Sequence, residues 1–269
     1  MDKNYELSIS NDFEKSIWQP FLKAIEDYDL VRDKDNIAVC ISGGKDSMLL
    51  ALLFKMLKGR RLYDIGVTYL CMDPGYTAKN RAMIEQNAAK LAIPVDIFES
   101  SIFESVFEIE KSPCYLCARM RRGHLYKNAQ DRGCNKIALG HHFDDVIETI
   151  LMSSLMSGQT RTMMPRLMSE NFEGMQLIRP LYLVAERDII SWRDKNELEF
   201  LACACKFTEQ TSSKEHESDS KRLVIKRLIE SLEGDIPNVR ENIFNSVTDI
   251  DVSHLISTKN APKNHNFLK

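Results

Sequence analysis

The sequence lacks the features that would mark a membrane, secreted or repeat protein. No apolar run reaches the length of a transmembrane segment. The first residues, MDKNYE, have neither the basic start nor the apolar core of a signal peptide, and no segment recurs at a fixed period. The composition, 43% hydrophobic and 28% charged over 269 residues, is that of a globular protein. We therefore expect a cytoplasmic protein that makes no contact with membranes.

An excess of positive charge is also missing. The 36 Lys and Arg residues are outnumbered by 39 Asp and Glu residues, which gives a net charge of −3. A protein with this balance binds nucleic acid only through a local basic patch. One candidate patch consists of Arg119, Arg121, Arg122 and Lys127. A solvated charged helix face explains the same four residues equally well.

A disulfide framework is not expected either. The seven cysteines are an odd number, which in a cytosolic chain favours metal or redox use of some of them. Cys40, Cys71 and Cys134 fit buried packing positions. The other four form a C-x-x-C, Cys114 and Cys117, and a C-x-C, Cys203 and Cys205. These pairs are compatible with a zinc site, a thiol redox pair or ligands of an iron–sulfur cluster.

The most informative stretch is a glycine loop, Ser42-Gly43-Gly44-Lys45-Asp46-Ser47, which joins an apolar β-prone run to an apolar helical run. Strand, glycine turn and helix in this order turn backbone N–H groups and the positive end of the helix dipole toward an anion. The glycines permit a tight turn, and Lys45 adds a positive charge. The spacing is not that of a Walker A loop. An ordinary strand–helix turn with a surface lysine is the alternative.

Strand and helix patterns alternate from residue 36 to about residue 196. This alternation predicts an α/β fold with a parallel, doubly wound sheet and a small C-terminal helical extension. We expect strands at 36–41, 64–71, 95–98, 136–139 and 175–179. We expect helices at 13–30, from the loop to about residue 58, and at 77–92, 103–109, 144–156, 185–196 and twice within 216–248, with 114–132 as a loop turning into a helix. Residues 1–12 are expected to be loosely ordered and 157–174 to form a loop.

The expected elements divide the chain into four parts. These are an N-terminal helical segment (1–34), the α/β domain with the C-x-x-C (35–200), a cysteine segment with helices (201–250) and a polar tail (251–269).

The fourth expected strand ends at a second polar motif, Gly140-His141-His142-Phe143-Asp144-Asp145. Ligands of parallel sheets bind at the carboxyl ends of strands, so we expect this motif, the glycine loop and Met72 to meet in one crevice. Two carboxylates beside a polyphosphate suit Mg²⁺. A helix N-cap is the alternative role, and it fits Asp144 better than Asp145. The histidines fit either simple packing or a catalytic role.

Three strings together resemble one family: S-G-G-K-D-S from residue 42, P-C-Y-L-C-A-R-M-R-R-G-H-L-Y from residue 113, and K-I-A-L-G-H-H-F-D-D from residue 136. They are similar to the TtcA-type tRNA 2-thiocytidine synthetases, which belong to the [4Fe-4S]-dependent PP-loop tRNA thiolases. The glycine loop resembles the PP-loop of ATP pyrophosphatases, which split ATP between the α- and β-phosphates. The resemblance covers about residues 36–205 and includes Ile178-Arg179-Pro180-Leu181.

The resemblance implies an ATP-, Mg²⁺- and [4Fe-4S]-dependent sulfurtransferase. Such an enzyme adenylates a carbonyl oxygen of a tRNA base, here cytidine C2, and replaces it with sulfur. The implied ATP-binding residues are Ser42, Gly43, Gly44, Lys45, Asp46, Ser47, Met72, Gly140 and His141. The implied catalytic residues are Lys45, Asp144, Asp145 and Cys203, and the implied cluster ligands are Cys114, Cys117 and Cys203, with Cys205 as the alternate third ligand. The implied partners are tRNA and a sulfur donor, either a cysteine desulfurase or sulfide, and a homodimer is compatible with the family.

Other functions are compatible with the same residues. A PP-loop ligase of the lysidine-synthase kind would use the loop without a cluster, so its conversion of ATP to AMP would survive the loss of Cys114 and Cys117. A thionucleobase-handling enzyme would apply related chemistry to another substrate. A non-catalytic module would only bind nucleotide or cluster, and Lys45→Ala would then leave the cellular phenotype intact.

Overall fold

The computed structural model describes residues 4–100, 113–201 and 217–251. The chain forms two compact units, Met1–Asp145 with Met164–Glu215 and Val146–Met163 with His216–Lys269. None of the described helices is long and apolar enough to cross a membrane. The four-part division expected from the sequence stays a prediction.

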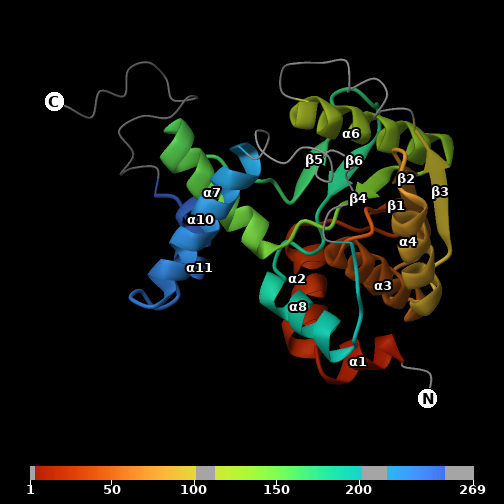
Figure 1. Ribbon diagram of the computed structural model, residues 1–269, viewed down its shortest axis with the longest axis horizontal. Coiled ribbons are helices and arrows are strands. Elements are labelled where there is room, and N and C mark those ends of the chain that lie inside the picture. The colour runs from red at the N-terminus through yellow and green to blue at the C-terminus, as the bar shows by residue number, and fades with distance from the viewer. Residues whose placement is uncertain (1–3, 101–112, 202–216, 252–269) are drawn as a thin grey trace. The chain divides into compact units, whose positions relative to one another are not determined.

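The first unit is built on a six-stranded sheet in the order β3-β2-β1-β4-β6-β5 (Figure 1). Its strands are β1 Asn36–Ile41, β2 Gly66–Asp73, β3 Val95–Glu99, β4 Lys136–Ala138, β5 Arg166–Met168 and β6 Gln176–Ile178. All neighbours pair in parallel except β5, which is antiparallel to β6. The α/β class and the five expected strands are confirmed. The expected loop over 157–174 is wrong, because the edge strand β5 forms within it.

Helices cover both faces of this sheet (Figure 1). α6 Pro113–Asp131 lies on one face, and α2 Gln19–Asp27, α3 Lys45–Gly59 and α8 Glu186–Lys195 lie on the other. Ala38 and Cys40 of β1 belong to the core beneath α6, together with Tyr126 of that helix. Ile37 and Val39 alternate with them and are fully buried toward the opposite face. Burial on both faces explains why β1 is a continuous apolar run.

The helix that follows the glycine loop is enclosed by the protein. Every residue of α3 from Ser47 to Phe54 is buried, which is the pattern of a helix with neighbours on all sides. The first turn of α3, and the loop before it, are therefore held in place by the core of this unit.

The N-terminal region is more regular than the sequence indicated. α1 Tyr5–Asn11 is a helix whose N-cap, Asn4, accepts the N–H of Leu7 at 3.0 Å. The expectation of loose order is therefore wrong for residues 4–12, because a side-chain cap stabilises this short helix. The helix expected over 13–30 forms as a π-helical segment, η1 Glu14–Trp18, followed by α2. Pro20 lies in the first turn of α2, where its missing N–H is not needed.

The other expected helices form where the sequence placed them, with one correction. They are α4 Ala78–Lys90, α7 Phe143–Ser157, α10 Glu217–Glu233 and α11 Val239–Thr248. The described backbone is helical from the start of α6, so the loop expected after residue 113 is wrong. The short helix expected at 103–109 lies outside the described residues.

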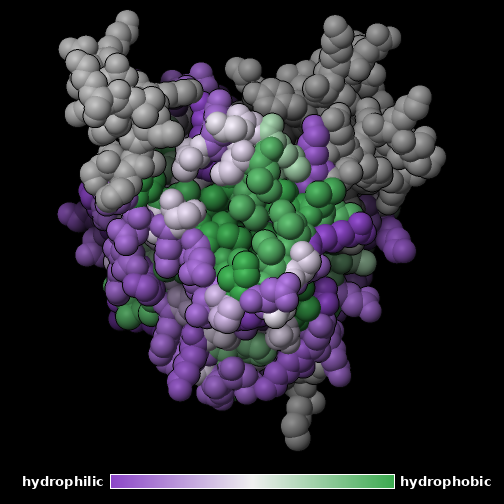
Figure 2. Space-filling view, turned by 90° about the vertical axis from the view of Figure 1, so that its left-hand side faces the viewer, coloured by the Kyte–Doolittle hydropathy of each residue, from purple (hydrophilic) through white to green (hydrophobic). Residues whose placement is uncertain are grey.

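The second unit contains most of α7 and all of α10 and α11. Arg222 Nε of α10 lies 3.4 Å from Oε2 of Glu148 on α7, and the Glu148 side chain is only 7% exposed. Figure 2 shows one area of the surface where hydrophobic residues gather, with hydrophilic residues around it. Exposed apolar side chains of α7 and α10 include Leu155, Met156, Leu223 and Val224.

Candidate active site

The glycine loop closes on itself and leaves the start of α3 uncapped. Ser47 Oγ accepts the N–H of Ser42 at 3.1 Å and donates to the carbonyl oxygen of Gly44 at 3.0 Å. Gly44 is the N-cap of α3 and makes no side-chain capping bond. The first N–H groups of a helix have no intrahelical acceptor. The loop therefore offers the backbone donors and the positive helix end that bind anions.

Two glycines allow neighbouring groups to pack closely against this loop. Gly43 has φ +86°, and a Cβ on it would lie 2.7 Å from Cγ1 of Ile84. A Cβ on Gly140 would lie 3.1 Å from the carbonyl carbon of Asp46 and 3.1 Å from the amide nitrogen of Ser47. A side chain at either position would push the loop away from its neighbours. Gly140 thus sets the close approach between the end of β4 and the first turn of α3.

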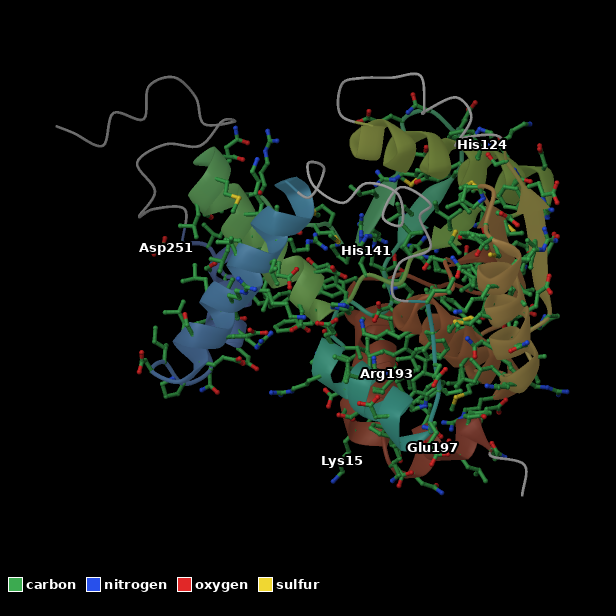
Figure 3. All side chains as sticks on the ribbon, in the orientation of Figure 1. Lys15, His124, His141, Arg193, Glu197 and Asp251 are labelled. Atoms are coloured by element: carbon green, nitrogen blue, oxygen red, sulfur yellow. The ribbon has the colours of Figure 1, made fainter. Side chains whose placement is uncertain are left out.

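A cavity of about 380 Å³ lies at the carboxyl ends of β1, β2 and β4. Its lining includes seven residues that the sequence assigned to the site: Ser42, Asp46, Ser47, Met72, Gly140, His141 and Asp145. Arg122 and Leu125 of α6 complete one wall of this cavity. In Figure 3, the label of His141 lies below α6 and above α8. Lys45 and Gly44 line a neighbouring cavity of about 770 Å³, which shares Ser42 and Asp46 with the first. The volumes are in the range of small-molecule sites.

Lys45 connects the loop to α8. Its Nζ lies 2.9 Å from Oε1 of Glu186 and 3.1 Å from Oδ1 of Asp46, and its side chain is 19% exposed. Burial on its own lowers the pKa of Lys45, but Asp46 and Glu186 outweigh burial and the pKa is raised. Lys45 is therefore a charged ammonium held by two carboxylates.

The two aspartates of the second motif differ from the expected order of preference for capping the helix that follows. Asp145 Oδ2 accepts the N–H of His142 at 3.1 Å, and the Asp145 N–H donates to Nδ1 of His142 at 3.4 Å. Asp145 therefore takes part in capping α7. Asp144 Oδ2 instead accepts the N–H of Glu186 at 2.6 Å, at the start of α8. The preference for Asp144 as the cap of its own helix is wrong, because a more distant helix end supplies its partner.

Two further residues join this cluster: His142, for which the sequence left packing and catalysis open, and Glu186, which the sequence did not indicate. His142 Nε2 lies 3.6 Å from Asp145, 3.9 Å from Asp46 and 4.0 Å from Glu186. Burial raises the pKa of Asp46, although His142 and Lys45 act against this. The second motif contains His142, so the sequence could have pointed to it. Glu186 lies 141 residues from Lys45, and no local pattern marks it. Within the described residues, no three His, Cys, Asp or Glu side chains form a metal-binding group.

The structure describes only the backbone of the first cysteine pair. Cys114 and Cys117 lie near the start of helix α6, and their side chains, like Cys203 and Cys205, fall outside what the structure describes. Leu201 donates its N–H to the carbonyl oxygen of Gly43 at 3.2 Å, and the Glu199 carbonyl accepts from Nδ2 of Asn87 at 2.8 Å. The chain leading to the second pair is thereby joined to the glycine loop.

The described residues of the expected basic patch lie in different surroundings. Arg122 lines the cavity, whereas Lys127 is exposed and pairs with Asp131 at 2.7 Å, which is the solvated-face alternative. The side chains of Arg119 and Arg121 fall outside the described part of α6.

Comparisons with known proteins agree with the resemblance. The family model for the PP-loop domain matches residues 11–206. A tRNA-cytidine(32) 2-sulfurtransferase of Pelobacter propionicus is 33% identical over 237 residues, covering 87% of this chain and 85% of that protein. A tRNA-cytidine(32) 2-sulfurtransferase 1 of Francisella philomiragia is 34% identical over 256 residues, covering 93% and 95%.

A solved structure shares the fold. The U34-tRNA thiolase NcsA from Methanococcus maripaludis, solved with its [4Fe-4S] cluster, superposes with a TM-score of 0.66 at 19% identity and covers 88% of this chain and 79% of its own. The chain therefore belongs to the PP-loop family and, within it, to the family of the tRNA-cytidine(32) 2-sulfurtransferases.

Proposed function

We propose that this protein uses ATP to replace the C2 carbonyl oxygen of a tRNA cytidine with sulfur, at position 32 as in the relatives' names. The observation that carries the proposal is the convergence of the uncapped glycine loop, Lys45 and the second motif on adjoining cavities. The position on the tRNA and the cytidine itself rest on the relatives, because the described side chains do not distinguish one base from another.

The first step is adenylation of the base. The cytidine O2 attacks the α-phosphorus of ATP, the new O–P bond forms, and the bond to the bridging oxygen breaks with its electrons going to pyrophosphate. The loop amides and Lys45 face the negative charge that accumulates on the leaving group, which is the main way in which proteins accelerate such transfers. Lys45 must exchange its contacts with Asp46 and Glu186 for phosphate oxygens during this step.

The nucleoside end of ATP lies on the other side of the first cavity. Met72 at the end of β2 and Leu125 of α6 offer apolar surface for the adenine, and His141 lies beside them. Asp144 or Asp145 would hold Mg²⁺, because a hard cation takes carboxylate and phosphate oxygens together. Each carboxylate also accepts a backbone N–H, Asp145 from His142 and Asp144 from Glu186, and these hydrogen bonds fix its orientation.

The second step is delivery of sulfur, which displaces AMP. The donor set fits an iron–sulfur cluster: Cys114 and Cys117 are three residues apart on a helix and so lie on one face of it. Cys203 is the third ligand, with Cys205 as the alternate. When bound by these thiolates, a [4Fe-4S] cluster would supply the iron that carries the sulfur.

Sulfide or a cysteine desulfurase provides the sulfur, and a homodimer stays a prediction. The proposed function is tested by mass spectrometry of tRNA nucleosides from a strain that lacks this protein. We expect 2-thiocytidine to be absent, to return with the wild-type protein, and to stay absent with Lys45→Ala. Unchanged 2-thiocytidine in the deletion strain would contradict the proposal.

A second variant separates the two steps. Cys114→Ala should lose bound iron and all thiolation while still binding ATP. If this variant still turned over ATP and still modified tRNA, a ligase of the lysidine-synthase kind would be the better description.

A further inference from the structure

We propose that His142 is a phosphate-binding residue whose Nε2–H donates to the triphosphate of ATP beside Lys45. The inference rests on the proposed function, because it assumes that ATP occupies the loop. It concerns a residue that lines neither cavity and for which the sequence left packing and catalysis open.

The hydrogen bonds of His142 fix its tautomer. Its Nδ1 accepts the N–H of Asp145 while its own N–H donates to Asp145 Oδ2. This reciprocal pair has the form of a capping box, with histidine in the place of serine or threonine. With Nδ1 accepting this hydrogen bond, Nε2 is the ring nitrogen left to donate. The helix start of α7 thus holds an imidazole donor in a set direction.

That donor faces the same two carboxylates as Lys45. Glu186 Oε1 lies 2.9 Å from Lys45 Nζ and 4.0 Å from His142 Nε2. Asp46 Oδ1 lies 3.1 Å from Lys45 Nζ and 3.9 Å from His142 Nε2. The ammonium and the imidazole therefore converge on one anionic position. The Nε2 separations exceed hydrogen-bond length, so these carboxylates do not satisfy the imidazole donor as a hydrogen-bond acceptor would.

Glu186 marks where a phosphate oxygen would bind. Its carboxylate stands between Lys45 and His142 as an anion of the chain itself, and its backbone N–H is held by Asp144. An incoming triphosphate repels this carboxylate and replaces it at Lys45. The His142 side chain is only 8% exposed, and a donor in such a dry site binds a charged acceptor more strongly than it would in water.

Two substitutions of His142 separate its role as a donor to phosphate from its role in capping α7. Asn at position 142 keeps an acceptor near the place of Nδ1, and it is a good N-cap, but it does not reach to the place of Nε2. Gln at the same position reaches with its amide N–H but caps a helix poorly. The measurements are the Kd of α,β-methylene-ATP, which lacks the cleavable bond, by titration calorimetry with Mg²⁺, and the melting temperature. His124→Asn, on the exposed surface of α6, is the matched control.

We expect His142→Asn to weaken analogue binding by about tenfold or more, the effect of losing one hydrogen bond to a charged acceptor, with little change in melting temperature. His142→Gln should bind closer to wild type and melt earlier, and His124→Asn should change neither value. Wild-type affinity in His142→Asn, or equal losses in the Asn and Gln variants, would overturn the inference alone. No analogue binding by the wild-type protein would overturn the proposed function and this inference with it.

Discussion

Charged side chains are arranged differently at the amino ends of the parallel strands (the amino edge) and at their carboxyl ends (the carboxyl edge). At the amino edge, the buried Lys136 lies 2.6 Å from Asp35. Asp29 accepts hydrogen bonds from Arg32 at 2.8 Å and from Arg166 at 2.7 Å. Charges at this edge are thus matched by partners within the chain.

The carboxyl edge gathers carboxylates around two basic side chains. Asp46, Asp144, Asp145 and Glu186 each lie within 4.0 Å of the His142 imidazole, and Lys45 contacts two of them. Like charges brought together in a half-buried site are unfavourable. We infer that the amino edge serves the stability of the fold, whereas the carboxyl edge serves the proposed binding of nucleotide.

The pKa values of two aspartates express the same contrast. Hydrogen bonds from Arg32 and Arg166 lower the pKa of Asp29 well below its usual range. Burial raises the pKa of Asp46 in spite of His142 and Lys45. The folded chain therefore favours the ionised form of one aspartate and disfavours that of the other.

The largest expected effect is on stability at the amino edge. Lys136→Met leaves Asp35 buried without its ammonium partner, which costs about 3–5 kcal/mol of unfolding free energy, measured by urea denaturation. Binding of α,β-methylene-ATP by the folded variant should not change. The double variant Asp35→Asn/Lys136→Met should recover part of the loss, and a single variant as stable as wild type would contradict this view of the edge.

The next effect is on chemistry at the carboxyl edge. Lys45→Ala removes the ammonium that faces the leaving pyrophosphate, so the rate of AMP formation should fall roughly 100- to 1000-fold. Its unfolding free energy should change much less than that of Lys136→Met. An unchanged rate of AMP release, measured with tRNA and sulfide, would show that Lys45 has no part in the transfer.

A smaller effect in the opposite direction is expected at Glu186. Glu186→Gln removes a negative charge that competes with phosphate for Lys45, so α,β-methylene-ATP should bind about tenfold more tightly. Glu170→Gln, at an exposed carboxylate, is the control for overall charge. Weaker binding in Glu186→Gln would mean that this carboxylate supports the nucleotide instead of competing with it.

The smallest effects are those of pH, and they differ in sign. The lowered pKa of Asp29 contributes stability that is present above the pKa of the unfolded chain and is lost as pH falls. Asp29→Asn should therefore be less stable than wild type at pH 7, with the difference shrinking in acid. The raised pKa of Asp46 reduces stability above its folded pKa, so Asp46→Asn should be more stable at pH 7 and converge with wild type as pH falls. Changes of the same sign, in urea titrations at several pH values, would contradict the contrast.

The sequence predicted the parts of the site that depend on local pattern. Residues 36–47 contain a strand, a glycine turn and a helix start within one short stretch, and the structure has them in that order. The second motif follows β4 for the same reason. Parallel pairing then brings both to one edge of the sheet.

Features set by distant partners escaped prediction. β5 is a strand only because it pairs with β6, since its residues are exposed and carry no apolar alternation. Asp144 accepts the N–H of Glu186, 42 residues away, which is why the preference for Asp144 as the cap of its own helix is wrong. No pattern within a window of sequence contains such a pairing.

The central claim is that the protein adenylates tRNA, and the most direct test is to follow labelled phosphate from ATP. Wild-type protein is incubated anaerobically with tRNA and ATP labelled at the α-phosphate while sulfur donors are withheld. We predict that label joins the tRNA, that sulfide then releases it as AMP, and that ATP labelled at the γ-phosphate transfers none. Transfer of label from the γ-phosphate, or tRNA that is thiolated without ever carrying label from the α-phosphate, would contradict adenylation at this loop.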